Sequence, residues 1–366
     1  MRRAGVRGSE YDSEMAESEV GRRQGDESSS VENYLAQVLE DCGEDTSGHI
    51  ARDLPAPGST DPALHALALA TSEGAEYSAG DDEHFFTIQS ISKPFVYALA
   101  IDDVGLDRVQ DSVGTEPSGE AFNELSLEGG TGRPLNAMIN AGAIVTHELV
   151  DYSDFGPDGG GPEDSGRTRQ TRRRTARVLA GLSAFAGREL RVEWELADAE
   201  YKEDYRNLAI ANMLKSHGVL QDEPQEALRG YADQCSVLVT VRDLARMAAT
   251  LANNGLHPET GDRVVSEQAA RQTLSVMATC GMYDGSGRWL AQIGIPAKSG
   301  ISGGIIGVLP GQVGLASFAP RLSEQGNSVQ GVEMFERLSH DLGLHLMASQ
   351  RREVNANLSG RVPHAD

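Results

Sequence analysis

Strand-like segments lie near both ends of this chain, and helical patterns fill the region between them. Near the N-terminal end, residues 63–71 are small and apolar, and we expect them and residues 83–88 to be the strands of a hairpin around residues 72–82. Three further segments of this kind lie near the C-terminal end: residues 291–297, 301–309 and 313–319. Residues 310–312, Pro-Gly-Gln, are typical of a hairpin turn, and such turns join antiparallel strands. The chain is therefore predicted to be an α/β (α+β) protein, with a central antiparallel sheet built from both ends, flanking helices and a mostly helical middle subdomain.

The helical patterns have recognisable ends. A first helix is expected to begin at Val31, and later helices are expected over residues 172–187, 205–217, 241–254, 266–280 and through 332–342. The best defined begins at Thr240, where Asp243 completes a capping-box-like start, and it stops at Gly255. Residues 107–135 are rich in Gly, Pro, Asn and Glu, and we expect them to form a long ordered loop.

Polar segments set the expected domain boundaries. Residues 1–29 are predicted to be a disordered tail and residues 349–366 a polar C-terminal tail. The domain between them, residues 30–348, is expected to contain a helical subdomain over about 105–280. Within it, the acidic, glycine-rich residues 151–165 are expected to be a flexible surface insertion. The arginine block at 167–174 is expected to start a solvated helix, with an anion or partner site as the alternative.

Charge and cysteine content limit the partners and the compartment. The formal net charge of −23 argues against nucleic acid or an anionic membrane as a partner, because both need a basic face. Three cysteines at irregular spacing (Cys42, Cys235 and Cys280) form neither a disulfide framework nor a zinc site. No signal-like start and no run of 18 apolar residues is present. We therefore expect a cytoplasmic protein without a membrane partner.

Histidines and glycines of this chain do not form a metal or nucleotide motif. His49, His147 and His340 each stand four residues from an acid but lack a third ligand nearby, so we expect surface pairs and no metal. Residues 302–304, Ser-Gly-Gly, lack the rest of a phosphate loop. The sequence therefore predicts no cofactor.

A serine and a lysine stand three residues apart where the apolar residues 85–88 run into a helix that ends near Gly105. This spacing places Ser90 and Lys93 on one helical face. A buried lysine with a lowered pKa can remove the proton that keeps serine a poor nucleophile. Lys298-Ser299-Gly300 follows much later, and Ser-x-x-Lys before Lys-[Thr/Ser]-Gly is the pattern of serine acyl-transfer enzymes of the penicillin-binding type. The chain has only four lysines, and two of them stand in these motifs.

Several short sequence motifs of unusual composition follow one another along the chain. They are Gln89-Ser90-Ile91-Ser92-Lys93, Glu116-Pro117-Ser118-Gly119 with Phe122-Asn123, Met138-Ile139-Asn140-Ala141-Gly142-Ala143-Ile144, Arg206-Asn207, Gln234-Cys235-Ser236, Cys280-Gly281-Met282-Tyr283-Asp284 and Pro296-Ala297-Lys298-Ser299-Gly300. In order and spacing they closely resemble the serine-dependent glutaminases, a family with the β-lactamase/penicillin-binding fold. The resemblance spans roughly residues 31–345.

The resemblance implies hydrolysis of L-glutamine to L-glutamate and ammonia, and it implies a homodimer or homotetramer. It places the nucleophile on Ser90 and its lysine partner on Lys93. The family's substrate contacts fall on Ser90, Asn140, Glu200, Asn207, Tyr231, Tyr283 and the backbone of Ile301. Among them, Glu200 is the natural partner of the substrate ammonium, while the amides and Tyr231 can hydrogen-bond its carboxylate.

The expected mechanism is acyl transfer in two steps. Neutral Lys93 takes the proton of Ser90, whose oxygen attacks the side-chain amide carbon of the substrate. Lys298 is expected to lower the pKa of Lys93 by like-charge repulsion. The backbone N–H groups of Ser90 and Ile301 would hold the oxyanion, each worth about 3 kcal/mol. Lys93 or Tyr283 would give the departing ammonia its proton, and water would then hydrolyse the ester.

Two positions hold residues other than those usual in the family. Asp53 stands where the family usually has a substrate-contacting tyrosine, and its carboxylate would repel that of the substrate. Ala199 stands where the family usually has serine before Glu200. Three other hypotheses stay open: an acyl-serine hydrolase for another amide, a non-catalytic glutamine-binding homologue, and a structural protein in which every motif is accidental.

Overall fold

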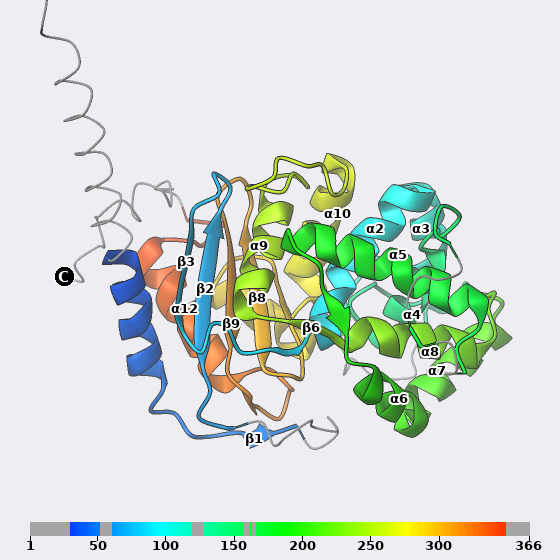
Figure 1. The fold of residues 1–366 in the computed structure, drawn as a ribbon, viewed down its shortest axis with the longest axis horizontal. Helices are drawn as coiled ribbons and strands as arrows, with labels where there is room; N and C mark the ends of the chain where they lie inside the picture. The colour runs from blue at the N-terminus through cyan, green and yellow to red at the C-terminus, as the bar shows by residue number, and fades with distance from the viewer. Residues whose placement is uncertain (1–29, 52–60, 119–126, 157–160, 163–165, 349–366) are drawn as a thin grey trace, which may run out of the picture.

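The structure is a computed structural model, and it describes residues 30–51, 61–118, 127–156, 161–162 and 166–348. Figure 1 shows a sheet with helices on both faces and, beside it, a group of helices from the middle of the chain. The tails predicted at 1–29 and 349–366 lie outside the described residues, and so does Asp53.

The central sheet joins the two ends of the chain. It has five strands in the order β3-β2-β9-β8-β7, and every neighbouring pair is antiparallel. The strands are β2 (Ala66–Thr71), β3 (Glu76–Gly80), β7 (Ala297–Ser299), β8 (Gly304–Leu309) and β9 (Val313–Phe318). β2 lies directly beside β9, with Ala68 opposite Ala316. The predicted antiparallel sheet built from both ends of the chain is therefore confirmed.

The predicted partner of the first strand is wrong. β3, and not residues 83–88, forms the hairpin with β2, since the chain reverses within a tight turn at Gly74 (φ 93°). The apolar residues Phe86–Thr87 form β4 in a second sheet of order β4-β6-β5, with β5 at Arg191–Val192 and β6 at Val237–Val239. Of residues 291–297, only Ala297 is in a strand, as the first residue of β7, because α11 (Ser286–Gln292) reaches into the segment. A short pair, β1 (His49–Ile50) with β10 (Arg321–Leu322), completes the strands of the described residues.

Helices cover both faces of the central sheet. Leu67 and Leu69 of β2 pack with α12 (Val329–Leu342) and with a helix over residues 30–42. The alternate residues, such as Ala68, face α9 (Val241–Ala252). This alternation follows from the two-residue period of a strand. The predicted capping box of Thr240 and Asp243 is present at the start of α9.

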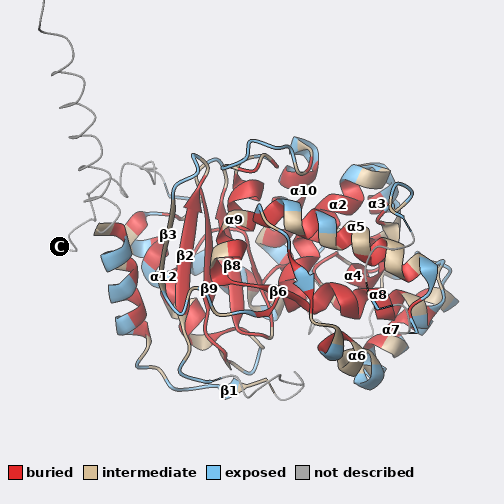
Figure 2. Cartoon of the chain, in the orientation of Figure 1, coloured by how far each residue is buried: buried red, intermediate tan, exposed pale blue. Residues whose placement is uncertain are grey.

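The middle of the chain is helical, as predicted. Its helices are α2 (Ser92–Val104), α3 (Leu106–Ser112), α4 (Asn140–Leu149), α5 (Arg169–Ala186), α6 (Trp194–Glu203), α7 (Tyr205–Ser216), α8 (Pro224–Cys235) and α10 (Glu267–Cys280). Figure 2 shows α2 and α9 buried almost throughout. The helices predicted as α5, α7, α9, α10 and α12 are confirmed. α6 and α8 were not predicted, and α3 occupies part of the predicted loop.

The arginine block starts a helix, as predicted, because α5 begins at Arg169, but only part of the block is solvated: Arg169 is exposed, whereas Arg167 and Arg174 are buried. Arg167 is fully buried and donates two hydrogen bonds to one oxygen of Asp233, at 3.0 and 2.6 Å. Arg174 is buried, and its guanidinium group donates a hydrogen bond to the Asp222 carboxylate at 2.5 Å. Arg173 donates to the Phe155 carbonyl at 2.6 Å. The block therefore packs into the chain itself, because each of these guanidinium groups finds an acceptor on a neighbouring element.

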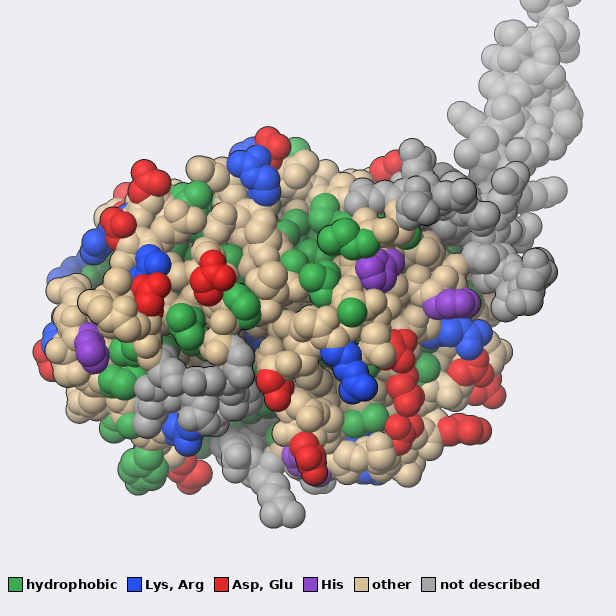
Figure 3. All heavy atoms as spheres, turned by 180° about the vertical axis from the view of Figure 1, so that it is seen from behind, with side chains coloured by type: hydrophobic (Ala, Val, Ile, Leu, Met, Phe, Trp, Pro, Cys, Tyr) green, Lys and Arg blue, Asp and Glu red, His purple; other side chains and the backbone are tan. Residues whose placement is uncertain are grey.

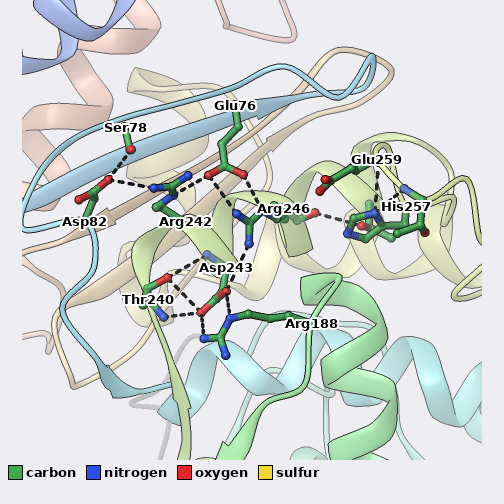
Figure 4. Close-up of polar contacts among 12 residues, drawn as sticks. Glu76, Ser78, Asp82, Arg188, Thr240, Arg242, Asp243, Arg246, His257 and Glu259 are labelled. Atoms are coloured by element: carbon green, nitrogen blue, oxygen red, sulfur yellow. Dashed lines mark hydrogen bonds and ion pairs between the residues drawn. The ribbon is translucent and has the colours of Figure 1, made fainter.

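The surface mixes charges of both signs. On the face in Figure 3, acidic and basic side chains are interspersed, and the visible described residues form no continuous basic area. An ion-pair network on α9, drawn in Figure 4, connects that helix to β3 and to the end of α5. Within the described ranges, no helix has the length and apolar character needed to cross a membrane.

Candidate active site

Ser90 lies in a strained turn between β4 and α2. The turn is a short 3-10 helix (Gln89–Ile91), and Gln89 has a left-handed backbone with φ 49°. Ser92 donates its hydroxyl proton to the Gln89 carbonyl at 2.7 Å, which holds this conformation. Pro94 is the third residue of α2, where its missing N–H costs nothing. The predicted junction of strand and helix at Ser90 is therefore present.

Lys93 is fully buried and contacts Ser90 directly. Its Nζ donates to the Ser90 hydroxyl and to Oδ1 of Asn140 at 2.9 Å. Asn140 in turn donates to Asn207 at 2.9 Å and accepts from the Tyr231 hydroxyl at 3.3 Å. Five of the predicted site residues therefore lie in one hydrogen-bonded group, although they come from the 3-10 turn at Ser90 and from α2, α4, α7 and α8.

Burial sets the charge state of both lysines. It lowers the pKa of Lys93 to about 8, while electrostatic interactions with Cys235 and Asp204 raise it. Burial also lowers the pKa of Lys298 well below its usual value, and the charge of Lys93 lowers it further. Burial is the largest cause of the lowered pKa of both lysines, and because repulsion between two ammonium groups is mutual, the expected effect of Lys298 on Lys93 stays a prediction.

Tyr283 and Lys298 lie together beside Ser90. Tyr283 also has a left-handed backbone (φ 55°), in a second short 3-10 helix (Tyr283–Gly285). Its hydroxyl donates to the Ser299 carbonyl at 3.3 Å, and Lys298 donates to the same oxygen at 2.6 Å. Burial raises the pKa of Tyr283 to about 12, against the lowering effect of hydrogen bonds with Ser90 and Ser299. The hydroxyl therefore carries a proton at neutral pH.

Ile301 lies in the turn between β7 and β8 that packs against the Ser90 segment. The turn is closed by a hydrogen bond from the Gly303 N–H to the Gly300 carbonyl at 3.0 Å. A Cβ atom added to Gly300 would lie 3.1 Å from the Ile91 side chain and 3.3 Å from the Ile88 carbonyl. The backbone at Ile301 is therefore held close to that of Ser90.

Glu200 reaches the site from α6 and is bound to the residue before the nucleophile. Its Oε1 accepts from the Gln89 amide at 2.6 Å, and Oε2 accepts from Ser236 at 3.5 Å. Burial raises the pKa of Glu200 to about 7, although the hydrogen bond from Gln89 lowers it. The carboxylate is thus partly protonated at neutral pH and would become fully charged beside a cation.

Four polar residues around the site were not found from the sequence. They are Gln89, Ser92, Asp204 and Gln234, each in contact with a predicted site residue or with the turn at Ser90. Asp204 carried a local signal, because an aspartate at the start of a predicted helix indicates an N-cap, and the other three stand in the motifs that resemble the family without an expected role of their own. The others act through tertiary contacts that local patterns do not record.

The described residues contain no group of three or more His, Cys, Asp and Glu side chains placed to hold a metal. The interpretation of His147 as a surface residue is wrong, since it is buried on α4 with Nδ1 2.9 Å from the Gln234 Oε1. Burial lowers its pKa to about 3, so it is neutral. His340 contacts Asp341 at the surface.

Comparisons with known proteins point to one family. A family model described as Glutaminase matches residues 48–347. A glutaminase of Corynebacterium efficiens is 50% identical over 320 residues, covering 87% of this chain and 72% of the relative. A glutaminase of Clavibacter michiganensis is 47% identical over 311 residues, covering 85% and 90%. The solved structure of Mglu in its glutamate form has a TM-score of 0.79 at 48% identity, covering 88% of this chain and 71% of that one. A probable glutaminase, ybaS, has a TM-score of 0.78 at 35% identity, covering 87% and 99%.

Proposed function

The chain belongs to the glutaminase family, and from this premise we propose that it hydrolyses L-glutamine to L-glutamate and ammonia through an acyl-enzyme on Ser90. The observation that carries the proposal is the fully buried Lys93, whose Nζ contacts the Ser90 hydroxyl and whose pKa is lowered to about 8. A lysine so placed can lose its proton near neutral pH, and it then has the geometry of a general base.

In the first half of the reaction, Ser90 Oγ gives its proton to neutral Lys93 and bonds to the side-chain amide carbon of the substrate. The negative oxygen would be held by the backbone N–H groups of Ser90 and Ile301. Breaking the carbon–nitrogen bond requires a proton on the departing nitrogen. Lys93 now carries one, and the protonated Tyr283 hydroxyl beside Ser90 is a second source.

In the second half, water attacks the glutamyl ester. Lys93 takes a proton from that water, the bond between the carbonyl carbon and Ser90 Oγ breaks, and the proton returns to Ser90. Lys298 stays neutral because burial and the charge of Lys93 disfavour its protonated form. We assign it the role of holding the Ser299 carbonyl, to which Tyr283 also donates.

Substrate recognition is proposed to divide between a cationic and an anionic part. Glu200 would bind the substrate ammonium, and a positive charge there would favour its ionised form. Asn140, Asn207 and Tyr231 would donate hydrogen bonds to the α-carboxylate without adding a full charge. These three groups form one hydrogen-bonded group with Lys93, so the α-carboxylate would be bound near Lys93 while the side-chain amide carbon lies against Ser90 Oγ.

We also propose that residues 30–348 form one catalytic domain, with a helical subdomain over about 105–280, and that the protein acts without a cofactor. A cytoplasmic homodimer or homotetramer that binds neither nucleic acid nor membranes is the working proposal for the assembly. The mixed charges of the face in Figure 3 support the exclusion of nucleic acid for that face.

The test is ammonia release from L-glutamine, L-asparagine and D-glutamine. We expect release from L-glutamine, reduced at least about a thousandfold in Ser90→Ala because the nucleophile is lost. Ser275→Ala is the matched control, since the Ser275 hydroxyl is bonded within its own helix α10 and its loss should leave turnover unchanged. Release from another amide alone would favour a different acyl-serine hydrolase. Binding of L-glutamine without any release would favour a non-catalytic homologue.

A further inference from the structure

Asp204 lies at the start of α7 and holds Asn207 at two points. One carboxylate oxygen accepts from the Asn207 backbone N–H at 3.0 Å, as an N-cap does. The other oxygen accepts from the Asn207 side-chain nitrogen at 2.5 Å. The second contact is not needed to cap a helix. It fixes which end of the Asn207 amide faces Asp204, because a carboxylate can only accept.

The orientation of the Asn207 side-chain amide determines that of Asn140, which contacts Lys93. The side-chain oxygen of Asn207 accepts from the Asn140 nitrogen at 2.9 Å, and the Asn140 oxygen accepts from Lys93 at 2.9 Å. An acceptor-only group stands at one end and a lysine at the other. Between them, both amides can satisfy these contacts in one orientation only.

We propose that Asp204 is a positioning residue for the glutaminase reaction, which orients the Asn207 and Asn140 amides so that Asn140 presents its oxygen to Lys93. This role rests on the proposed function, and Asp204 lies outside the motifs that resemble the family. The side-chain nitrogens of Asn207 and Asn140 each donate one N–H to the next residue in this series, Asn207 to Asp204 and Asn140 to Asn207. The second N–H of each nitrogen is the group that would donate to the substrate carboxylate, so Asp204 orients the donors of the binding site as well.

Electrostatics gives the same residue a second effect on the base. Burial lowers the pKa of Lys93, and Cys235 and Asp204 act in the opposite direction. Among the other titratable groups near Lys93, burial raises the pKa of Cys235 to about 12, raises that of Tyr231 and lowers that of Lys298, so these three groups are neutral and Asp204 supplies the charge. Asp204 would therefore set how much of Lys93 is neutral at a given pH. Removing its charge should lower the pKa of Lys93, so the rise of kcat with pH should move to lower pH. This shift reports the charge of Asp204, whereas its effect on the orientation of the amides is reported by the difference in kcat/KM between two variants that both remove the charge.

Two variants separate orientation from capping. Asp204→Asn keeps the shape and can keep an oxygen for the Asn207 backbone N–H, but its amino group then faces the Asn207 amino group. To remove this contact between two donors, the side-chain amide of Asn207 and then that of Asn140 must rotate by about 180°. The rotation places the Asn140 amino group, a donor, against Lys93. Asp204→Ser keeps a capping hydroxyl and opposes no donor to Asn207. The more conservative change in shape is therefore expected to be the more harmful one.

The experiment measures kcat and KM for L-glutamine from pH 6 to 9, with the thermal unfolding midpoint, for the wild type and both variants. We expect kcat/KM to fall about a hundredfold in Asp204→Asn and about tenfold in Asp204→Ser, because small displacements at a reacting centre cost this much. In both, the rise of kcat should move to lower pH, and the unfolding midpoints should stay close to the wild type.

Equal activity of the two variants, or a wild-type pH profile in both, would overturn the role of Asp204. A loss that merely follows the unfolding midpoint would do the same, since it would indicate a structural cap. Each of these results leaves the glutaminase activity of the wild type in place. An inactive wild type would instead reject the proposed function.

Discussion

Gln89 is the residue on which the geometry of the nucleophile depends most. A left-handed backbone at a residue other than glycine costs about 1–2 kcal/mol. The cost is offset by the Ser92 hydroxyl on the Gln89 carbonyl and by Gln234, which donates to Ser92 at 2.9 Å. The Gln89 side chain meanwhile holds Glu200. One residue thus connects the turn at Ser90 with the carboxylate proposed to bind the substrate ammonium.

The charge of Glu200 predicts a pH dependence of substrate binding. Burial raises its pKa to about 7, so the carboxyl is protonated below that pH and charged above it. Only the charged form attracts an ammonium group. We expect the affinity of the Ser90→Ala variant for L-glutamine to fall about tenfold per pH unit below that pKa. Isothermal titration calorimetry from pH 5.5 to 8.5 measures binding without turnover.

The Gln89→Met variant in the same Ser90→Ala background is the control for this assignment. It removes a hydrogen bond that lowers the pKa of Glu200, so the fall in affinity should begin at higher pH. An affinity that is flat between pH 6 and 8 would show that Glu200 does not carry the ammonium interaction.

At the scale of elements, local signals predicted what local contacts determine. The capping residues of α9 and α10 stand in the sequence, and the structure places both helices where those residues indicate. The partner of β2 was misjudged because β3 is an edge strand with half-exposed, polar residues. The apolar β4 looked like the better partner, yet it is apolar because it is buried against β6 at the junction with the helices.

The site shows the same division. The spacing of Ser90 and Lys93 is a local property of a helix start, and their side chains do meet. The roles of Asp204 and Gln234 depend on contacts across several helices, which no window of sequence contains. The depth of burial of each lysine, which dominates the pKa of both Lys93 and Lys298, is likewise a property of the folded chain and not of the sequence around either residue.

Gly314 of β9 is where α9 packs most closely on the sheet. A Cβ atom added there would lie 2.1 Å from the Ala249 nitrogen and 2.6 Å from the Ala245 carbonyl oxygen, and backbone cannot move aside as a side chain can. We expect Gly314→Ala to lower the free energy of unfolding by about 1–3 kcal/mol through overpacking. Urea denaturation followed by circular dichroism measures the change.

Gly287→Ala is the matched substitution. Gly287 lies in α11 with no atom within 4 Å of an added Cβ, so alanine should be neutral or stabilise by up to about 1 kcal/mol through helix propensity. If both variants lost the same stability, close packing of α9 on β9 would not be the cause.

At the scale of the molecule, the ion-pair network of α9 joins parts of the chain that are far apart in sequence (Figure 4). Glu76 of β3 accepts from Arg242 at 2.7 Å and from Arg246 at 2.5 Å. Asp243, on the same helix, accepts from Arg188 at the end of α5 at 2.5 Å. The network therefore links the central sheet to the helical middle of the chain through α9.

Asp243 is the member of this network whose loss should matter most. Its side chain is 1% exposed, and it also accepts from the Thr240 backbone N–H at 2.7 Å and from the Thr240 hydroxyl. Asp243→Ala removes the capping box and leaves Arg188 without this acceptor. We expect it to lower the free energy of unfolding by about 3 kcal/mol. Arg188 is 37% exposed, so Arg188→Gln should cost only about 1 kcal/mol.

Arg337→Gln supplies the comparison with a surface pair. Arg337 is 47% exposed and pairs with Asp341 one turn along α12, so its loss should change the free energy of unfolding by less than about 0.5 kcal/mol. Urea denaturation at low and at moderate salt measures all three variants. Salt should reduce the effect of Arg188→Gln more than that of Asp243→Ala, because exposed pairs are screened and the buried cap is not. If Arg188→Gln cost as much as Asp243→Ala at both salt concentrations, the exposed arginine, and not the buried carboxylate with its cap, would hold the two parts of the molecule together.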